Sequence, residues 1–167
     1  MILAYKPSYG WEFLPAGPIF QAIPVSSAVA GFIGTALTTV LYFGAFLAEK
    51  ISQGTLVITL EGVFSFLLGL GLGITVGTIG GTFVVAWYIA IFGLPVALIL
   101  RNRLRSGLGL ALAMATAIAA AYFANVTLSF PGGPGWEPSV LVLCFAIPAG
   151  LIYRRNIIAL SDELEVD

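Results

Sequence analysis

The stretch "GLGLGITVGTIGG", residues 69–81, decides the fold because it combines six glycines with a complete absence of charge. Glycine destabilises a helix in water, whereas small residues inside a membrane let two helix backbones approach closely. Gly69, Gly73, Gly77 and Gly81 recur at intervals of four, so a helix places them along one face. The spacing predicts a glycine zipper, in which this face contacts the backbone of a neighbouring helix.

The composition of the whole chain is that of a membrane protein. Of its 167 residues, 59% are hydrophobic and 9% are charged, with a mean hydropathy of +1.04. Soluble domains contain about 25% charged residues, so this chain has too few polar groups to cover a surface in water. Apolar runs of about 20 residues, the length that crosses a hydrocarbon core, recur along it. The composition predicts an all-α, polytopic transmembrane helix bundle.

The predicted organisation has three parts: an interfacial segment at 1–21, a transmembrane bundle at 22–155 and an acidic cytoplasmic tail at 156–167. Prolines and aromatic rings mark the first segment, and four acids mark the last. Solvated disorder is the expectation for the tail, because it is short and acidic. Four spans are favoured, at about 24–48, 62–100, 106–128 and 139–153.

The second span is the difficult one, because no charge occurs between Glu61 and Arg101. The run from Gly62 to Leu100 corresponds to about 58 Å of helix, which suits one long span or two spans with a turn at Gly80-Gly81. The glycines keep their register through residue 81, which favours one continuous helix, tilted or kinked. Five spans remain the alternative.

The third span is rich in alanine and contains a second set of small residues at spacing four. These are Gly107, Ala111, Ala115 and Ala119. They predict a second packing face, and the two small-residue faces can meet each other or a partner helix.

Arginines indicate the orientation in the membrane. Two clusters flank the third and fourth spans, namely Arg101, Arg103 and Arg105, then Arg154 and Arg155. Short basic loops stay in the cytoplasm, so the C-terminus is predicted inside, in a bacterial inner membrane. The same arginines are expected to contact anionic lipid headgroups.

The sequence lacks the residue types that several kinds of functional site require. The chain has no histidine and a single cysteine, Cys144, and no ionisable residue lies well inside a span. We therefore expect no catalytic residues, no cofactor, no metal and no nucleic-acid partner. Glu61, at the edge of the second span, is interpreted as a solvated carboxylate near a helix N-terminus. Its alternative role is a coupling or gating carboxylate.

The sequence thus predicts a non-enzymatic integral membrane protein, an accessory or assembly subunit or a self-associating scaffold that packs through small-residue helix faces. Its expected partners are membrane lipids and either another membrane protein or copies of itself. The alternative hypothesis is a small oligomeric channel or carrier, lined by Glu61 and by threonines of the first two spans.

Overall fold

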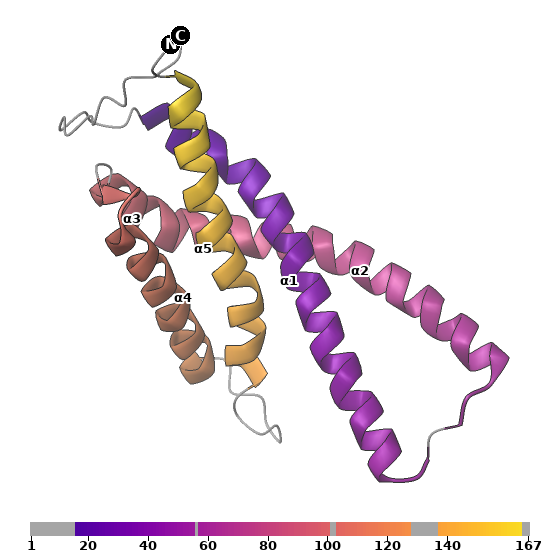
Figure 1. Cartoon of the computed structure of the whole chain (residues 1–167). Helices are drawn as coiled ribbons and strands as arrows, with labels where there is room; N and C mark the ends of the chain where they lie inside the picture. The colour runs from indigo at the N-terminus through magenta and orange to yellow at the C-terminus, as the bar shows by residue number, and fades with distance from the viewer. Residues whose placement is uncertain (1–15, 56, 101–102, 128–136, 165–167) are drawn as a thin grey trace, which may run out of the picture.

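The computed structural model describes residues 16–55, 57–100, 103–127 and 137–164, which form helices and connecting turns without a strand. The predicted all-α fold is therefore confirmed. Figure 1 shows the helices in chain order. They are α1 (Ala16–Ser52), α2 (Leu60–Tyr88), the π-helical turn η1 (Ile89–Gly93), α3 (Leu94–Ile99), α4 (Gly107–Thr127) and α5 (Glu137–Leu164).

The glycine-rich run is one long helical element and contains no hairpin. Helix α2 passes through Gly80-Gly81 without a turn and continues through η1 into α3. At η1 the N–H of Leu94 donates to the carbonyl of Ile89, five residues earlier, just before Pro95. Proline lacks an N–H and clashes with the carbonyl four residues before it, so a widened turn accommodates the ring. The continuous second element that the glycine register favours is therefore confirmed.

Three helical segments are long and apolar enough to cross a membrane: Ala16–Ser52, Leu60–Ile99 and Pro138–Asp162. A shorter apolar helical segment, Gly107–Phe123, accompanies them. Many large apolar side chains on these helices are exposed, including Leu72 and Trp87, which suits a protein whose surroundings are lipid. The chain is therefore membrane-embedded.

The core lies at one end of the molecule, where the first half of α1, the second half of α5 and the end of the long second element meet. Buried side chains from these elements pack together there, among them Ile19, Val85, Ile89, Tyr153 and Ile157. Helix α4 packs along α5 on the other side (Figure 1). The N-terminal end of α1 and the C-terminal end of α5 therefore lie at the same end of the bundle.

The remaining halves of α1 and α2 leave this core and form a helical hairpin, which we call the α1–α2 arm (residues 37–52 and 60–76). The arm extends beyond α4 and α5 in Figure 1. Inside it, the rings of Phe43 and Phe66 stack with their centroids 4.4 Å apart. Most of the other large apolar side chains of the arm are exposed.

Two predicted boundaries differ from the structure. Helix α1 begins at Ala16, so residues 16–21 are helical and Ile19 is fully buried, while residues 1–15 lie outside the described part. Helix α5 continues to Leu164, so residues 156–164 are not a solvated tail. The reason is that Ile157 and Ser161 recur at helical spacing and are buried, with exposed fractions of 0% and 3%. Packing therefore prevails over the acidic composition.

Candidate functional site

The site best defined by the structure is the crossing of α1 and α2, where glycines remove the side chains between two backbones. A Cβ added to Gly31 would lie 2.6 Å from the backbone nitrogen of Thr82. A Cβ added to Gly77 would lie 2.6 Å from Cγ2 of Thr35. Such distances are too short for real carbon atoms, so only glycine fits at Gly31 without a shift of backbone.

A third helix joins this crossing through one aromatic ring. Phe145 of α5 lies over Gly34 of α1 and Gly81 of α2, and a Cβ at either glycine would overlap its ring. The Cβ of residue 81 would also lie 3.1 Å from the carbonyl oxygen of Gly31. The glycines therefore make room both for backbone contact and for an inserted ring, as the close-packing prediction requires.

The predicted glycine stripe is divided into two halves. Gly77 and Gly81 contact α1 and α5, as described above. Gly69 and Gly73 lie on the same face of α2 but belong to the arm, where a Cβ at either position would meet no atom within 4 Å. The stripe is thus an internal packing surface at one end and an open surface at the other.

The second small-residue stripe also faces outward. Its members are all exposed: Gly107, Ala111, Ala115 and Ala119. The face of α4 turned toward the rest of the protein holds other small residues: Gly109, Ala113, Ala117 and Ala121. A Cβ at Gly150 of α5 would be 3.4 Å from the Cβ of Ala113. Small residues occur on both faces of this alanine-rich helix, so spacing alone could not select the buried one.

Two long-range hydrogen bonds fasten α5 to α1. The hydroxyl of Tyr153 donates to the carbonyl oxygen of Ile19 over 3.0 Å, and the amide Nδ2 of Asn156 donates to Oγ of Ser26 over 2.9 Å. Both bonds join residues more than 100 positions apart in the chain. Sequence reasoning missed these contacts, because a tyrosine and an asparagine near a basic cluster resemble ordinary interfacial residues.

The threonines of α1 and α2 form hydrogen bonds mostly within their own helices. The hydroxyls of Thr35, Thr39, Thr75 and Thr82 each donate to the carbonyl four residues earlier, over 2.8 Å in every case. Only the hydroxyls of Thr38 and Thr78 are buried without a partner among the described residues. The threonine hydroxyls are thus largely satisfied locally, as is common in membrane helices.

The predicted arginine clusters come together at the end of the bundle that carries the core. Arg154 donates from Nε to the carbonyl of Leu104 over 2.7 Å, and from Nη2 to the carbonyls of Arg105 and Ser106 over 3.2 and 3.4 Å. These bonds tie α5 to the turn that precedes α4. Arg154 therefore has a structural role that the predicted headgroup contact did not include.

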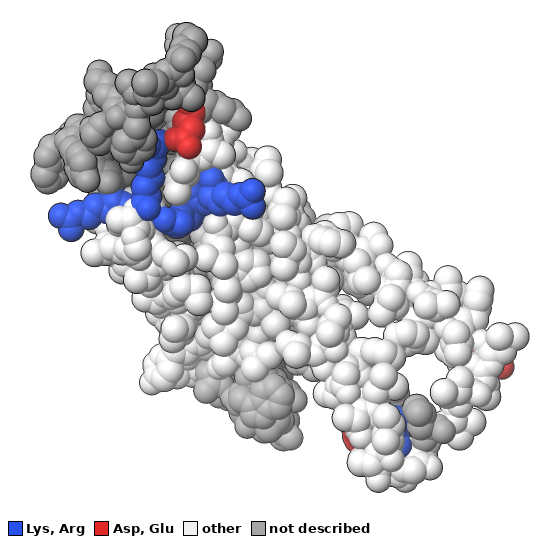
Figure 2. Space-filling view, in the orientation of Figure 1, with Lys and Arg blue, Asp and Glu red and all other residues white. Residues whose placement is uncertain are grey.

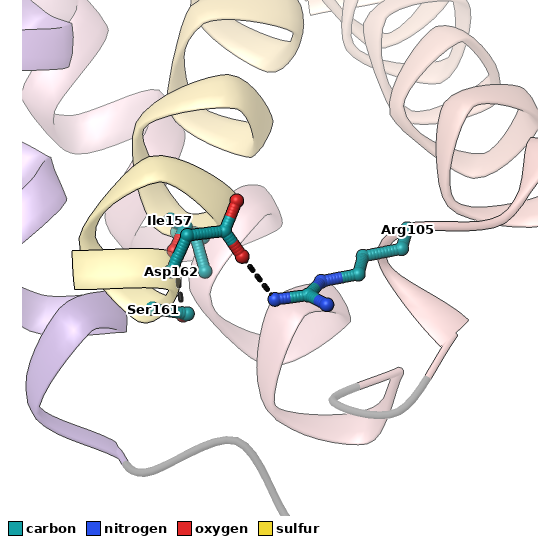
Figure 3. Close-up of polar contacts among 4 residues, drawn as sticks. All are labelled: Arg105, Ile157, Ser161 and Asp162. Atoms are coloured by element: carbon teal, nitrogen blue, oxygen red, sulfur yellow. Dashed lines mark hydrogen bonds and ion pairs between the residues drawn. The ribbon is translucent and has the colours of Figure 1, made fainter. Parts of the chain in front are cut away.

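An ion pair adds a second tie at this end. Figure 3 shows Arg105, before α4, pointing toward Asp162 of α5, and the two form an ion pair in which both side chains are half-exposed. Arg103 and Arg155 are exposed nearby, whereas Arg101 lies outside the described residues. Figure 2 shows the positive surface concentrated over this end of the molecule.

Glu61 lies at the opposite end, in the first turn of α2 and near the tip of the arm. Its side chain is exposed, and the helix is capped by Thr59, whose Oγ1 accepts a hydrogen bond from the N–H of Gly62 over 3.1 Å. This position is that of a carboxylate beside the positive end of a helix dipole.

Two hollows follow the seam between the long second element and α5. The larger one has a volume of about 210 Å³ and lies between α2 and the first half of α5. The smaller one has a volume of about 30 Å³ and lies between η1, α4 and the second half of α5. Tyr88 borders both hollows, and its hydroxyl is 3.2 Å from Oγ1 of Thr116. The described residues contain no cluster of side chains suited to hold a metal ion.

Comparison of the chain with known protein families, with curated proteins and with solved structures gives no match.

Proposed function

We propose that the chain is a non-enzymatic integral membrane protein that works by helix association, as an assembly subunit or a self-associating scaffold. The observation that carries this proposal is the open half of the glycine stripe. Gly77 and Gly81 use the stripe for close contact within the chain, and Gly69 and Gly73 continue the same face without a neighbour. A second helix that packs against that half would likewise contact a backbone surface without side chains.

The length of the second helical element supports the proposal independently. The uncharged run from Gly62 to Leu100 corresponds to about 58 Å of helix. A helix tilted by about 40°, the upper end of the usual range, needs only about 39 Å to cross a hydrocarbon core of about 30 Å. Roughly 20 Å of apolar helix is thus in excess of an ordinary span. Contact with another copy or another membrane protein would cover this excess.

We also propose an orientation, which the basic end of the bundle supports. Arg103, Arg105, Arg154 and Arg155 lie together there, with the C-terminal end of α5. The preference of short basic loops for the cytoplasm puts this end inside and the arm tip outside, in a bacterial inner membrane.

The alternative, a small channel or carrier, has less support. A permeation path needs polar groups available to the permeating species, and four threonine hydroxyls of α1 and α2 are bonded to their own helices. Glu61 lies near the arm tip and away from the core. The unpartnered hydroxyls of Thr38 and Thr78 are the features that favour a path.

Purification in mild detergent, followed by measurement of the molar mass of the protein component, tests the proposal. We expect a complex of at least two chains, either copies or a copy with another membrane protein. Liposomes containing the purified protein are expected to show no ion flux above that of empty liposomes. A lone monomer, or a clear flux, would contradict the proposal.

A further inference from the structure

The larger hollow is a groove suited to hydrocarbon. Its walls come from Val84 and Val85 of α2 and from Leu141, Val142, Phe145 and Ala146 of α5, and they present no polar surface to the space inside. Water is unfavourable in a cavity without polar partners, even one large enough to hold it. A groove of about 210 Å³ with such walls is better filled by part of an alkyl chain.

The groove and the basic end lie along one face of α5, with the smaller hollow between them. On α5, Val142, Ala146, Gly150 and Arg154 follow one another at spacing four, so they share a face of the helix. Ala146 is about 12 Å and Val142 about 18 Å from Arg154 along the helix axis. Half of a hydrocarbon core is about 15 Å. The groove therefore lies at the depth reached by the chain of a lipid whose headgroup is beside Arg154.

Positive charge gathers where that headgroup would lie. The guanidinium of Arg154 donates to three carbonyl groups, which carry no net charge. Arg103 and Arg155 are exposed at the same end, where Asp162 is engaged with Arg105. Figure 2 shows that the positive surface lies directly beside the uncharged surface of the bundle. Guanidinium groups are well suited to bind phosphate.

We propose that this seam is a binding site for one membrane phospholipid with an anionic headgroup. The phosphate and headgroup lie against Arg103, Arg154 and Arg155, and an acyl chain lies along α5 with its end in the groove beside Val84 and Val142. The bound lipid fills the space between α2 and α5, so it stabilises the contact between the two helices. The site does not depend on association of the chain through its arm.

The thermal unfolding temperature of the protein in a non-ionic detergent tests the site. Phosphatidylglycerol added at saturating concentration is expected to raise this temperature by about 5 °C, and phosphatidylcholine with the same chains by much less. Inorganic phosphate at the same concentration is expected to have no effect, because it has no chain. An equal shift with phosphatidylcholine, or with phosphate alone, would overturn the proposal.

Two variants separate the contributions of chain and charge. Val84→Trp fills the groove and is expected to remove most of the shift caused by phosphatidylglycerol, whereas Val76→Trp, at another exposed valine of α2, should retain it. The double variant Arg103→Gln/Arg155→Gln should reduce the difference between the two lipids, and Lys50→Gln, at the arm, should not. An unchanged shift in Val84→Trp, or an unchanged difference in the arginine variant, would contradict the site.

Discussion

Gly31 and Thr82 bring the backbones of α1 and α2 into direct contact. A Cβ on Gly31 would be 2.6 Å from the nitrogen of Thr82 and 2.9 Å from its Cα, and backbone atoms cannot rotate away as a side chain can. The glycine at this position is therefore a requirement of the crossing. Beyond the crossing the two helices diverge as they continue into the arm. This divergence leaves one face of the arm open.

Gly31→Ala is expected to destabilise the protein, because the added methyl group forces the two backbones apart. Overpacking of this kind typically costs about 1–3 kcal/mol. Thermal unfolding in detergent measures the effect as a lower unfolding temperature. Gly44→Ala is the matched control, since it lies on the same helix and a Cβ there meets nothing within 4 Å. Equal stability of the two variants would contradict the close crossing.

Tyr153→Phe removes one hydroxyl and should weaken the attachment of α5 to α1. The hydroxyl donates to the carbonyl of Ile19 in a buried position, and a bond of this kind contributes about 1 kcal/mol. The loss is expected as a small drop in unfolding temperature. Tyr122→Phe serves as the control, because Tyr122 is 72% exposed. A drop as large in the control would show that the bond to Ile19 is not the cause.

Arg154→Gln should loosen the turn before α4, because the forked guanidinium reaches the carbonyls of three successive residues there. Hydrogen bonds from charged groups contribute about 1.5–3 kcal/mol. Arg154→Lys keeps the charge but loses the fork, so it should recover only part of the stability. Full recovery in the lysine variant would mean that charge, not geometry, is what matters. Unfolding in non-ionic detergent measures both variants.

Cysteines introduced at the two ends of the bundle test the proposed topology. In a Cys144→Ala background, Gln53→Cys at the tip of the arm should react with a membrane-impermeant reagent added outside intact cells. Ser106→Cys, before α4, should react only after the cells are opened. The structure puts these positions at opposite ends of the molecule, since the basic end carries Ser106 and the arm tip carries Gln53. Reaction of both positions from one side would contradict four spans.

Much of the fold could be predicted from hydropathy and glycine spacing. The continuous second element followed from four glycines in one register, because a turn at Gly80-Gly81 would have broken the stripe. The close contacts at Gly77 and Gly81 followed from the same spacing. These features are local in the chain, and helix geometry translates them directly into a face.

Other features depended on long-range contacts that spacing does not encode. On α4 the stripe through Ala111 and the stripe through Ala113 have equally small residues, and only contact with Gly150 distinguishes them. The helical extension of α5 past Asn156 depends on Ile157, which packs into the core at the start of α1. Gly69 and Gly73 have no neighbouring helix because α1 and α2 diverge in the arm. A sequence pattern cannot predict this divergence.

The proposed function requires that the open half of the glycine face binds another helix. Gly73→Leu adds bulk to that half, where an added Cβ would meet no atom of a neighbouring helix within 4 Å, so the fold should persist while association is lost. Gly71→Leu, two residues away, places the same bulk on the opposite face of α2. Gly77→Leu would be less informative, because Thr35 already occupies the space beside it.

The most direct measurement is the molar mass of these variants in mild detergent, with thermal unfolding recorded on the same samples. Gly71→Leu is expected to keep the mass of the complex, whereas Gly73→Leu should fall to a single chain with an unchanged unfolding transition of its α1–α5 core. A Gly73→Leu variant that assembles as fully as Gly71→Leu would contradict the claim.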